Sequence, residues 1–268
     1  MKRRNKNSKA FLAGGLLMVF FLLVAVFAPA IAPYDPNEMG IPYLKPSREH
    51  LLGTNDVGQD IFSELIYGTR VSLLIGVFTA AVVTVFATGV ALISGYYGKT
   101  ADRCLTAVTN ITMALPELAL TVLLVAYLKP GKISIIIAIS LTAWTGTARV
   151  LRARVMQLVE MPFIKIEKAI GVKSSVIMVK HLIPNLKDII LTRAAMSVSS
   201  AMMTEASLSF LGLGDYGEKS WGSILHYAFY QNGVIRNYYW WYLPPILCTS
   251  LAVLGFMLIG YYGFQRRD

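Results

Sequence analysis

Long apolar runs, separated by polar and basic segments, form the main pattern of the chain. A bilayer core of roughly 30 Å is crossed by about 20 mostly apolar helical residues. The runs that reach this length are Phe11–Ile31, Val71–Gly95, Leu105–Leu128 and Trp241–Tyr262. Two weaker runs extend from Ile133 to about Val150 and from Ile189 to about Phe210. Together they predict an all-α membrane protein with six transmembrane helices.

Composition and charge support a membrane protein and argue against nucleic-acid binding. The 268 residues are 55% hydrophobic and 15% charged, whereas soluble domains carry about 25% charged residues. The net charge of +10 lies in patches between apolar runs, so it does not indicate a nucleic-acid-binding face. Cys104 and Cys248 lie beside or inside apolar runs, and neither a disulfide nor a zinc site is expected.

The basic residues also orient the predicted spans. With the N-terminus inside, six spans place 18 of the 25 Lys and Arg residues on the inner side and seven on the outer side. Both termini are therefore predicted to be cytoplasmic. The start, "MKRRNKNSK" before an apolar run and "APA", also resembles a signal peptide, but the run is long for the apolar part of one, which covers about 7 to 15 residues.

The longest inner loop contains the stretch "MPFIKIEKAIGVKSSVIMVKHLIPN", Met161–Asn185. Phe163, Ile166 and Ile170 recur at helical spacing, which predicts a short amphipathic helix. Gly171 is placed to end this helix in a left-handed conformation, and Pro184 marks an expected bend into the next span. The pattern alone leaves open whether the apolar face lies on lipid or on a protein partner.

This loop resembles the cytoplasmic loop of binding-protein-dependent ABC importer permeases. Its signature is E-A-A, three residues, G, nine residues, then I-x-L-P; here Gly171 and the "HLIP" of His181–Pro184 stand at the matching distances. The E-A-A positions depart from the signature and read Lys165, Ile166 and Glu167. That departure leaves an altered ATPase contact or an altered partner open.

Further segments extend the resemblance over nearly the whole chain. They are similar to landmarks of the dipeptide/oligopeptide/nickel subfamily, specifically its C-type permease subunit. The segments are "HLLGTNDVGQDIFSELIYGTRVSLLIG" (His50–Gly76), "AWTGTARVLR" (Ala143–Arg152), "EASLSFLGLG" (Glu205–Gly214) and "WWYLPPILC" (Trp240–Cys248).

The resemblance implies a type I ABC importer permease bundle in a bacterial or archaeal cytoplasmic membrane. Residues 1–69 would form the N-terminal tail, first transmembrane helix and outer loop, and residues 70–268 a five-helix core with a coupling loop at about 155–184. The implied partners are a B-type permease, two cytoplasmic ATPases that bind ATP and Mg, and an extracytoplasmic binding protein. The implied ATPase-coupling residues are Phe163, Ile164, Lys165, Ile166, Glu167, Lys168, Ala169, Ile170 and Gly171.

The chain itself is expected to be neither an ATPase nor a metal protein. It contains no G-x-x-x-x-G-K-[ST]: in "GYYGKT" the position five before Gly98 is Ile93, so no catalytic residue and no cofactor is expected here. His50, His181 and His226 lack metal-ligand spacing. Whether the cargo is a peptide, nickel or a metal chelate stays open.

Polar residues inside the predicted spans are candidates for the translocation path. Asn110 and Glu117 are seven apart, two helical turns, and so are expected to share a face. The other candidates are Ser197, Ser200, Thr204 and Glu205. Each of these residues either lines the path or makes polar contacts with a neighbouring helix.

Two other classes of protein compete with the importer permease. A secondary transporter would be expected to show paired or inverted repeats, and none is visible. An intramembrane hydrolase would need a catalytic motif such as H-E-x-x-H, which does not occur. A secondary transporter or an orphan membrane subunit without ATPase partners is therefore the alternative to the importer permease.

Overall fold

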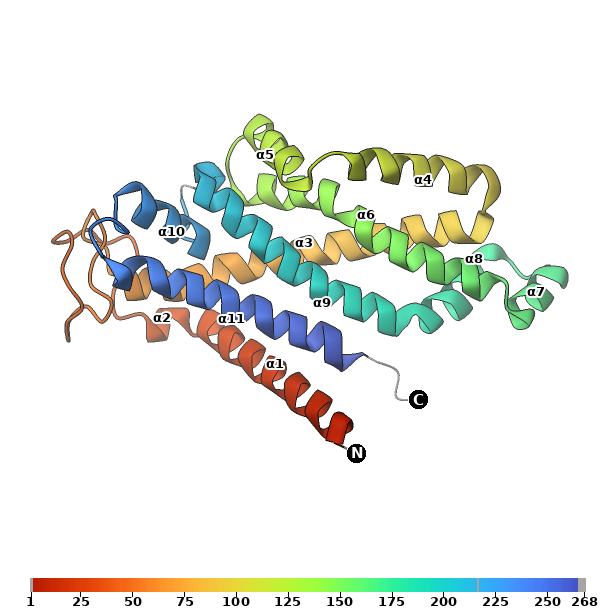
Figure 1. Ribbon diagram of the computed structural model, residues 1–268, viewed down its shortest axis with the longest axis horizontal. Coiled ribbons are helices and arrows are strands. Elements are labelled where there is room, and N and C mark those ends of the chain that lie inside the picture. The colour runs from red at the N-terminus through yellow and green to blue at the C-terminus, as the bar shows by residue number, and fades with distance from the viewer. Residues whose placement is uncertain (1, 216, 265–268) are drawn as a thin grey trace.

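A computed structural model describes residues 2–215 and 217–264, and this part of the chain is helical (Figure 1). The α-helices are α1 (Lys2–Val26), α2 (Ala28–Ile31), α3 (Ile61–Tyr97), α4 (Lys99–Ala114), α5 (Glu117–Leu128), α6 (Lys132–Val159), α7 (Pro162–Ala169), α8 (Ser174–Ile177), α9 (Ile183–Leu208), α10 (Trp221–Tyr230) and α11 (Tyr239–Gly263). Two π-helical turns, η1 (Met178–Leu182) and η2 (Ser209–Leu213), adjoin α9 at its two ends.

The described residues form four helices that are long and apolar enough to cross a membrane: α1, α3, α6 and α11. The bent pair α4 and α5 adds a fifth if it is one span. Helix α9 is 26 residues long, but Lys187, Asp188, Arg193 and Glu205 lower its hydropathy. The fold is thus an all-helical membrane bundle with four or five candidate spans. The termini whose side was predicted, Met1 and residues 265–268, lie outside the described residues.

The third apolar run, Leu105–Leu128, was predicted to form one transmembrane helix. In the structure it is divided between two helices, α4 and α5. Helix α4 ends at Ala114 and α5 begins at Glu117, and the angle between their two axes is 88°. Pro116 explains the break, because its ring disfavours helical geometry at the preceding residue, and Leu115 is indeed extended with ψ 141°. The expectation that Asn110 and Glu117 share a helix face is therefore wrong.

The long helix α3 lies at the centre of the bundle, between α6 and α9. Helix α1 packs along α11 at one side of the molecule (Figure 1). Glycine allows this close approach: a Cβ added to Gly14 would lie 2.8 Å from the carbonyl oxygen of Gly255. Small residues of this kind are typical of helix contacts in membranes, where dispersion replaces the hydrophobic effect.

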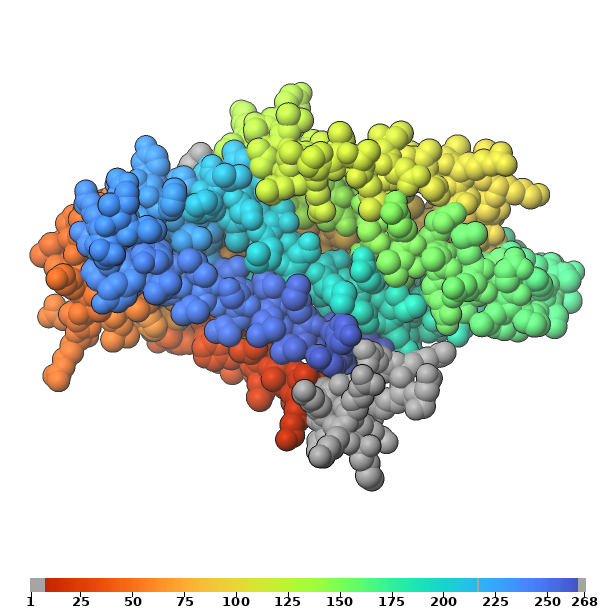
Figure 2. Space-filling model, viewed as in Figure 1, coloured from red at the N-terminus to blue at the C-terminus, as the bar shows by residue number. Residues whose placement is uncertain are grey.

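The two ends of the bundle differ in structure. Helices α7 and α8 project at one end, and α10 lies with residues 33–60 at the other (Figures 1 and 2). Residues 212–240 contain the short helix α10. Residues 33–60 instead form turns around a β-bridge between Thr54 and Asp60.

The bend expected at Pro184 falls where a π turn joins α8 to α9. Backbone angles stay helical from α8 through η1 into α9. Proline lacks the N–H that would donate to the residue four before it, and the π turn lies directly ahead of it, with Ile183 N–H donating to Met178 O. The wider π turn lets the helix pass the proline without breaking.

Candidate translocation cavity and coupling loop

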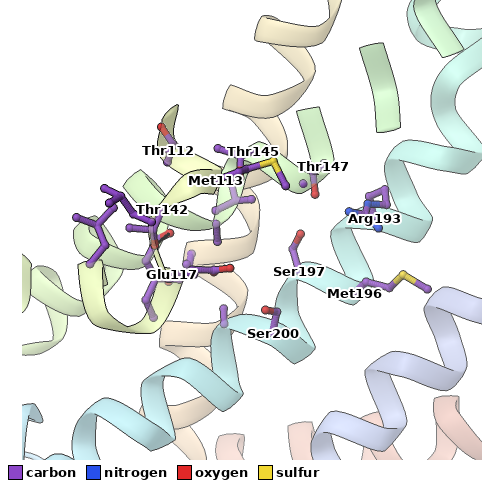
Figure 3. A pocket seen from close by; sticks show the side chains of 18 residues that line it. Thr112, Met113, Glu117, Thr142, Thr145, Thr147, Arg193, Met196, Ser197 and Ser200 are labelled. Carbon is purple, nitrogen blue, oxygen red and sulfur yellow. Dashed lines mark hydrogen bonds between the residues drawn. The ribbon is translucent and has the colours of Figure 1, made fainter. Parts of the chain in front are cut away.

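A cavity of about 410 Å³ lies inside the bundle, between α3, α4, α5, α6 and α9 (Figure 3). Hydroxyl and methionine side chains make up much of its wall, among them Thr145, Ser197 and Met196. Two charged side chains line it as well, Glu117 and Arg193. Figure 3 shows these two on opposite sides of the cavity, with Ser197 between them.

Glu117 reaches the cavity because of the break in the third apolar run. Pro116 caps α5, so Glu117 is the first helical residue and its carboxylate stands at the positive end of the helix dipole. The Glu117 backbone carbonyl accepts a hydrogen bond from Thr121 Oγ1 at 2.7 Å. Glu117 is exposed at the cavity, and it forms no ion pair with the side chains described between residues 8 and 264.

Arg193 lies ten residues into α9, about 15 Å along the helix from Ile183. Its side chain is half-buried, and its buried Nε has no hydrogen-bond partner in the described part of the chain. The guanidinium passes Gly146 of α6, where an added Cβ would lie 3.6 Å from Nη2. The guanidinium thus lies at van der Waals distance from this part of α6.

The structure divides the predicted path residues into two groups. Glu117, Ser197 and Ser200 line the cavity, whereas Thr204 does not. Asn110 borders a separate small cleft, where its Oδ1 accepts a 3.0 Å hydrogen bond from Arg149 Nη2.

Glu205 stands outside the cavity, within a buried cluster of hydroxyls. Its carboxylate accepts hydrogen bonds from Ser209 Oγ at 2.8 Å and Ser72 Oγ at 3.3 Å, and from Ser220. Ser72 Oγ in turn accepts the backbone N–H of Trp221 at 3.2 Å. The cluster joins α3, α9 and α10, so the position of Glu205 is that of a packing residue.

The loop helix α7 is held firmly to the bundle on one face. Ile164 is fully buried in a cluster with Leu158, Ile177 and Leu182. On the same helix, Lys168 Nζ lies 4.1 Å from the ring centre of Tyr96. These contacts fix the helix against α3 and the end of α6.

The predicted apolar face of α7 points away from the bundle. Phe163, Ile166 and Ile170 are 40%, 61% and 72% exposed. The predicted glycine cap is confirmed: Gly171 has φ +80°, its N–H donates to Lys168 O, and Val172 N–H donates to Glu167 O. This is the double hydrogen bond of a Schellman motif, which gives the helix a defined end.

The residues that depart from the E-A-A signature bond within the chain. Lys165 Nζ lies 2.8 Å from Glu160, and this contact holds the pKa of the Glu160 carboxyl below its ordinary value. Glu167 lies 2.9 Å from His181 Nε2. The middle position, Ile166, belongs to the exposed face.

The motif at His50–Gly76 forms a polar cluster at the α10 end of the bundle. Asn55 Nδ2 donates to Gln59 and to Glu64, each at 3.0 Å, and Lys219 Nζ lies 2.9 Å from Glu64 and 2.8 Å from Gln59. We call Asn55, Gln59, Glu64 and Lys219 the outer polar cluster. Gly58, with φ +83°, lets the loop pass, because an added Cβ would lie 2.1 Å from Gly40 O.

Arg193 was not among the predicted path residues, although it belongs to the polar span that was expected to face protein or a water-filled path. The available signal was a positive charge inside a mostly apolar run, because such a charge faces a cavity or protein. The histidines are kept apart: His50 bonds Asp60, His181 bonds Glu167, and His226 bonds the carbonyl of Phe210.

Known proteins match the chain over nearly its whole length. Residues 87–267 match the family "Binding-protein-dependent transport system inner membrane component", and residues 1–48 match the "N-terminal TM domain of oligopeptide transport permease C". A dipeptide transport system permease, DppC of Alkalihalophilus pseudofirmus, is 34% identical over 95% of this chain and 84% of its own. The oligopeptide permease OppC of Bacillus subtilis is 32% identical over 96% and 84%.

A glutathione transport permease, GsiD of Pectobacterium atrosepticum, is 30% identical over 96% of this chain and 86% of its own. Among solved structures, a chain of the inward-facing MetNI methionine ABC transporter superposes with a TM-score of 0.59 at 18% identity. That match covers 75% of this chain and 94% of the other, and it supports the fold.

These matches confirm the family that the motifs indicated. Its members are the membrane-embedded permeases of ABC transporters and are not themselves the ATPases. The chain therefore belongs to the inner-membrane permeases of binding-protein-dependent ABC importers, among the relatives of the C-type subunits DppC and OppC.

Proposed function

We propose that this chain is one half of the membrane pathway of an ATP-driven importer of short peptides. A B-type permease supplies the other half, two cytoplasmic ATPases bind beneath and hold ATP and Mg, and an extracytoplasmic binding protein delivers the cargo. The relatives' names support peptides over nickel or metal chelates, since they describe dipeptide, oligopeptide and glutathione permeases.

The proposed topology has six spans with both termini cytoplasmic. The spans are α1, α3, the bent pair α4–α5, α6, α9 and α11. Arg193 supports including α9, because a charged helix is tolerated in a membrane when it faces a cavity or protein. The division at residue 69 falls within α3, so residues 1–69 and the 70–268 core share that helix.

Coupling to the ATPases is assigned to Phe163–Gly171. The observation that carries this proposal is the exposed apolar face of α7, which stands at the end of the bundle while Ile164 anchors the opposite side. Such a face fits a groove on a protein partner. ATP binding shifts the permease only by its preference for one of the two permease states, and a capped, anchored helix transmits that preference as a rigid body.

The cavity around Glu117, Ser197 and Ser200 is assigned to the translocation path. It lies within the bundle and carries polar groups that would be expensive in lipid. Asn110, Thr204 and Glu205 bound or face other parts of the bundle, so we assign them to helix packing.

The test is co-purification and uptake with substitutions at Gly171. Arg at this position is strained at φ +80° and places bulk at the end of α7. Gly171→Arg is expected to abolish peptide uptake by the assembled importer in proteoliposomes, with the permease still in the membrane. Gly171→Asn is the matched control, since asparagine tolerates left-handed geometry, and it should retain uptake.

Two results would contradict this function. The chain purified from its native membrane without a second permease or ATPases would indicate an orphan subunit. Full uptake by well-expressed Gly171→Arg would remove the coupling role of the loop.

A further inference from the structure

Arg193 is a half-buried charge that no residue in the described part of the chain neutralises. Among residues 2–215 and 217–264 no carboxylate lies within 4.0 Å of it, and its Nε has no hydrogen-bond partner. Two other partly buried cations of the bundle are paired with carboxylates: Arg152 bonds Asp102 through two hydrogen bonds of 2.5 and 2.6 Å, and Lys219 pairs with Glu64. Arg193 therefore differs from the cations that hold helices together.

A guanidinium inside a membrane bundle is costly unless it meets water or an anion. Arginine also presents a planar fork of N–H donors that matches a carboxylate. The cavity wall beside it is open, because Gly146 carries no side chain and the nearby Ser197 offers only a hydroxyl. The unpartnered edge of Arg193 is thus suited to receive a carboxylate from outside this chain.

The opposite wall supplies the complementary charge. Glu117 projects into the same cavity from the start of α5 and has no cationic partner in the described part of the chain (Figure 3). The volume of about 410 Å³ falls within the range of small-molecule sites, roughly 300 to 1,000 Å³. Two opposite charges separated by a polar cavity favour a ligand that carries both charges.

We propose that this cavity is a transient binding site for a zwitterionic peptide, with the terminal carboxylate at Arg193 and the terminal ammonium at Glu117. Ser197 and Ser200 offer hydrogen bonds to the peptide group between the two ends. Met113 and Met196 provide adaptable apolar wall for varied side chains. The proposal rests on the proposed function, and it adds the chemical group by which the permease recognises its cargo.

The test measures recognition of each peptide terminus separately. The assembled complex of this chain with its partner permease and ATPases, purified in detergent without the binding protein, is dialysed against radiolabelled alanyl-alanine, its C-terminal amide and its N-acetyl form. The wild-type complex should prefer the free dipeptide over the amide by about tenfold or more, because a charged hydrogen-bonded pair is lost with the amide.

Arg193→Gln should bind the free dipeptide and its amide equally, and should still prefer the free dipeptide over the N-acetyl form. Glu117→Gln should bind the free dipeptide and the N-acetyl form equally, and should still prefer the free dipeptide over the amide. Arg193→Lys keeps the charge and should keep part of the preference. Arg154→Gln, which removes an arginine that bonds to Gln157 at the end of α6, is the control and should bind as wild type does.

Specific outcomes would overturn the proposal. One is equal or undetectable binding of free and amidated dipeptide by the wild-type complex. Another is an unchanged preference in Arg193→Gln. A third is loss of the partner permease from Arg193→Gln but not from Arg193→Lys, which would assign the guanidinium to the subunit interface.

The failure of this site is distinguishable from failure of the proposed function. If proteoliposomes with the binding protein import dipeptide but the variants keep wild-type terminus preferences, only the site is wrong. If the wild-type importer moves no peptide, the proposed cargo is wrong as well.

Discussion

The outer polar cluster and the inner cavity place the same kinds of charge in opposite situations. In the outer polar cluster, Glu64 is 1% exposed and is satisfied by Lys219 and Asn55. In the cavity, Glu117 and Arg193 face each other without closing into an ion pair. The His50–Gly76 motif supplies three residues of the outer polar cluster, and the Ala143–Arg152 motif supplies part of the cavity wall. Motif membership alone therefore does not separate structure from function.

The difference lies in whether the charges inside the bundle are paired with each other. A closed ion pair fixes geometry, and the outer polar cluster joins the 40–60 loop, the start of α3 and the segment before α10. Two charges that do not form an ion pair gain no mutual attraction to offset the free-energy cost of their desolvation. Charges of the second kind are where a solute can act, and the two regions should therefore respond differently to substitution.

The largest loss of stability is expected from Lys219→Met. The substitution leaves the buried Glu64 carboxylate without its cation, and breaking a buried pair in this way costs about 3–5 kcal/mol. Denaturant unfolding in detergent would measure it. The double variant Glu64→Gln/Lys219→Met should recover much of the loss, and a single variant as stable as wild type would show that the pair is not structural.

A smaller loss is expected from Arg152→Gln. Arg152 binds Asp102 bidentately and so ties α6 to α4, but both side chains are partly exposed, at 28% and 19%. Charged hydrogen bonds of this kind contribute about 1.5–3 kcal/mol, and the exposure places the effect near the lower value. The same unfolding assay measures this loss of stability. If Arg152→Gln lost as much stability as Lys219→Met, burial would not determine how much each ion pair contributes.

The smallest loss of stability is expected from Arg193→Gln. Arg193 Nε has no hydrogen-bond partner in the described part of the chain, so the substitution breaks no bond to this atom. The free energy of unfolding should therefore change by about 0.5 kcal/mol or less. Peptide uptake should nevertheless fall strongly. Destabilisation comparable to that of Lys219→Met would contradict the contrast between open and closed charges.

Sequence patterns predicted the fold best where one physical signal dominated. Apolar length identified α1, α3, α6 and α11, and helical spacing with a left-handed glycine identified α7 and its cap at Gly171. The break at Pro116 was not predicted, because the apolar run continues through it while the proline constrains only local backbone.

The cavity was less accessible to sequence reasoning than the loop. Glu117 and Arg193 come from helices far apart in the chain, and periodicity within one helix does not report which helices meet. Asn110 and Glu117 illustrate the error, since their seven-residue spacing predicted a shared face that the bend at Pro116 removes. For Glu205, sequence left packing and substrate contact open, and the hydroxyl cluster around its carboxylate favours packing.

The central claim is that this chain is a permease driven through the exposed face of α7. The most direct measurement compares peptide-stimulated ATP hydrolysis by assembled importers carrying Ile166→Asp or Val179→Asp. Both residues are apolar and 61% exposed, but only Ile166 lies on the proposed docking face. We predict that Ile166→Asp loses stimulation and uptake while Val179→Asp keeps both; equal activity of the two variants would contradict the account.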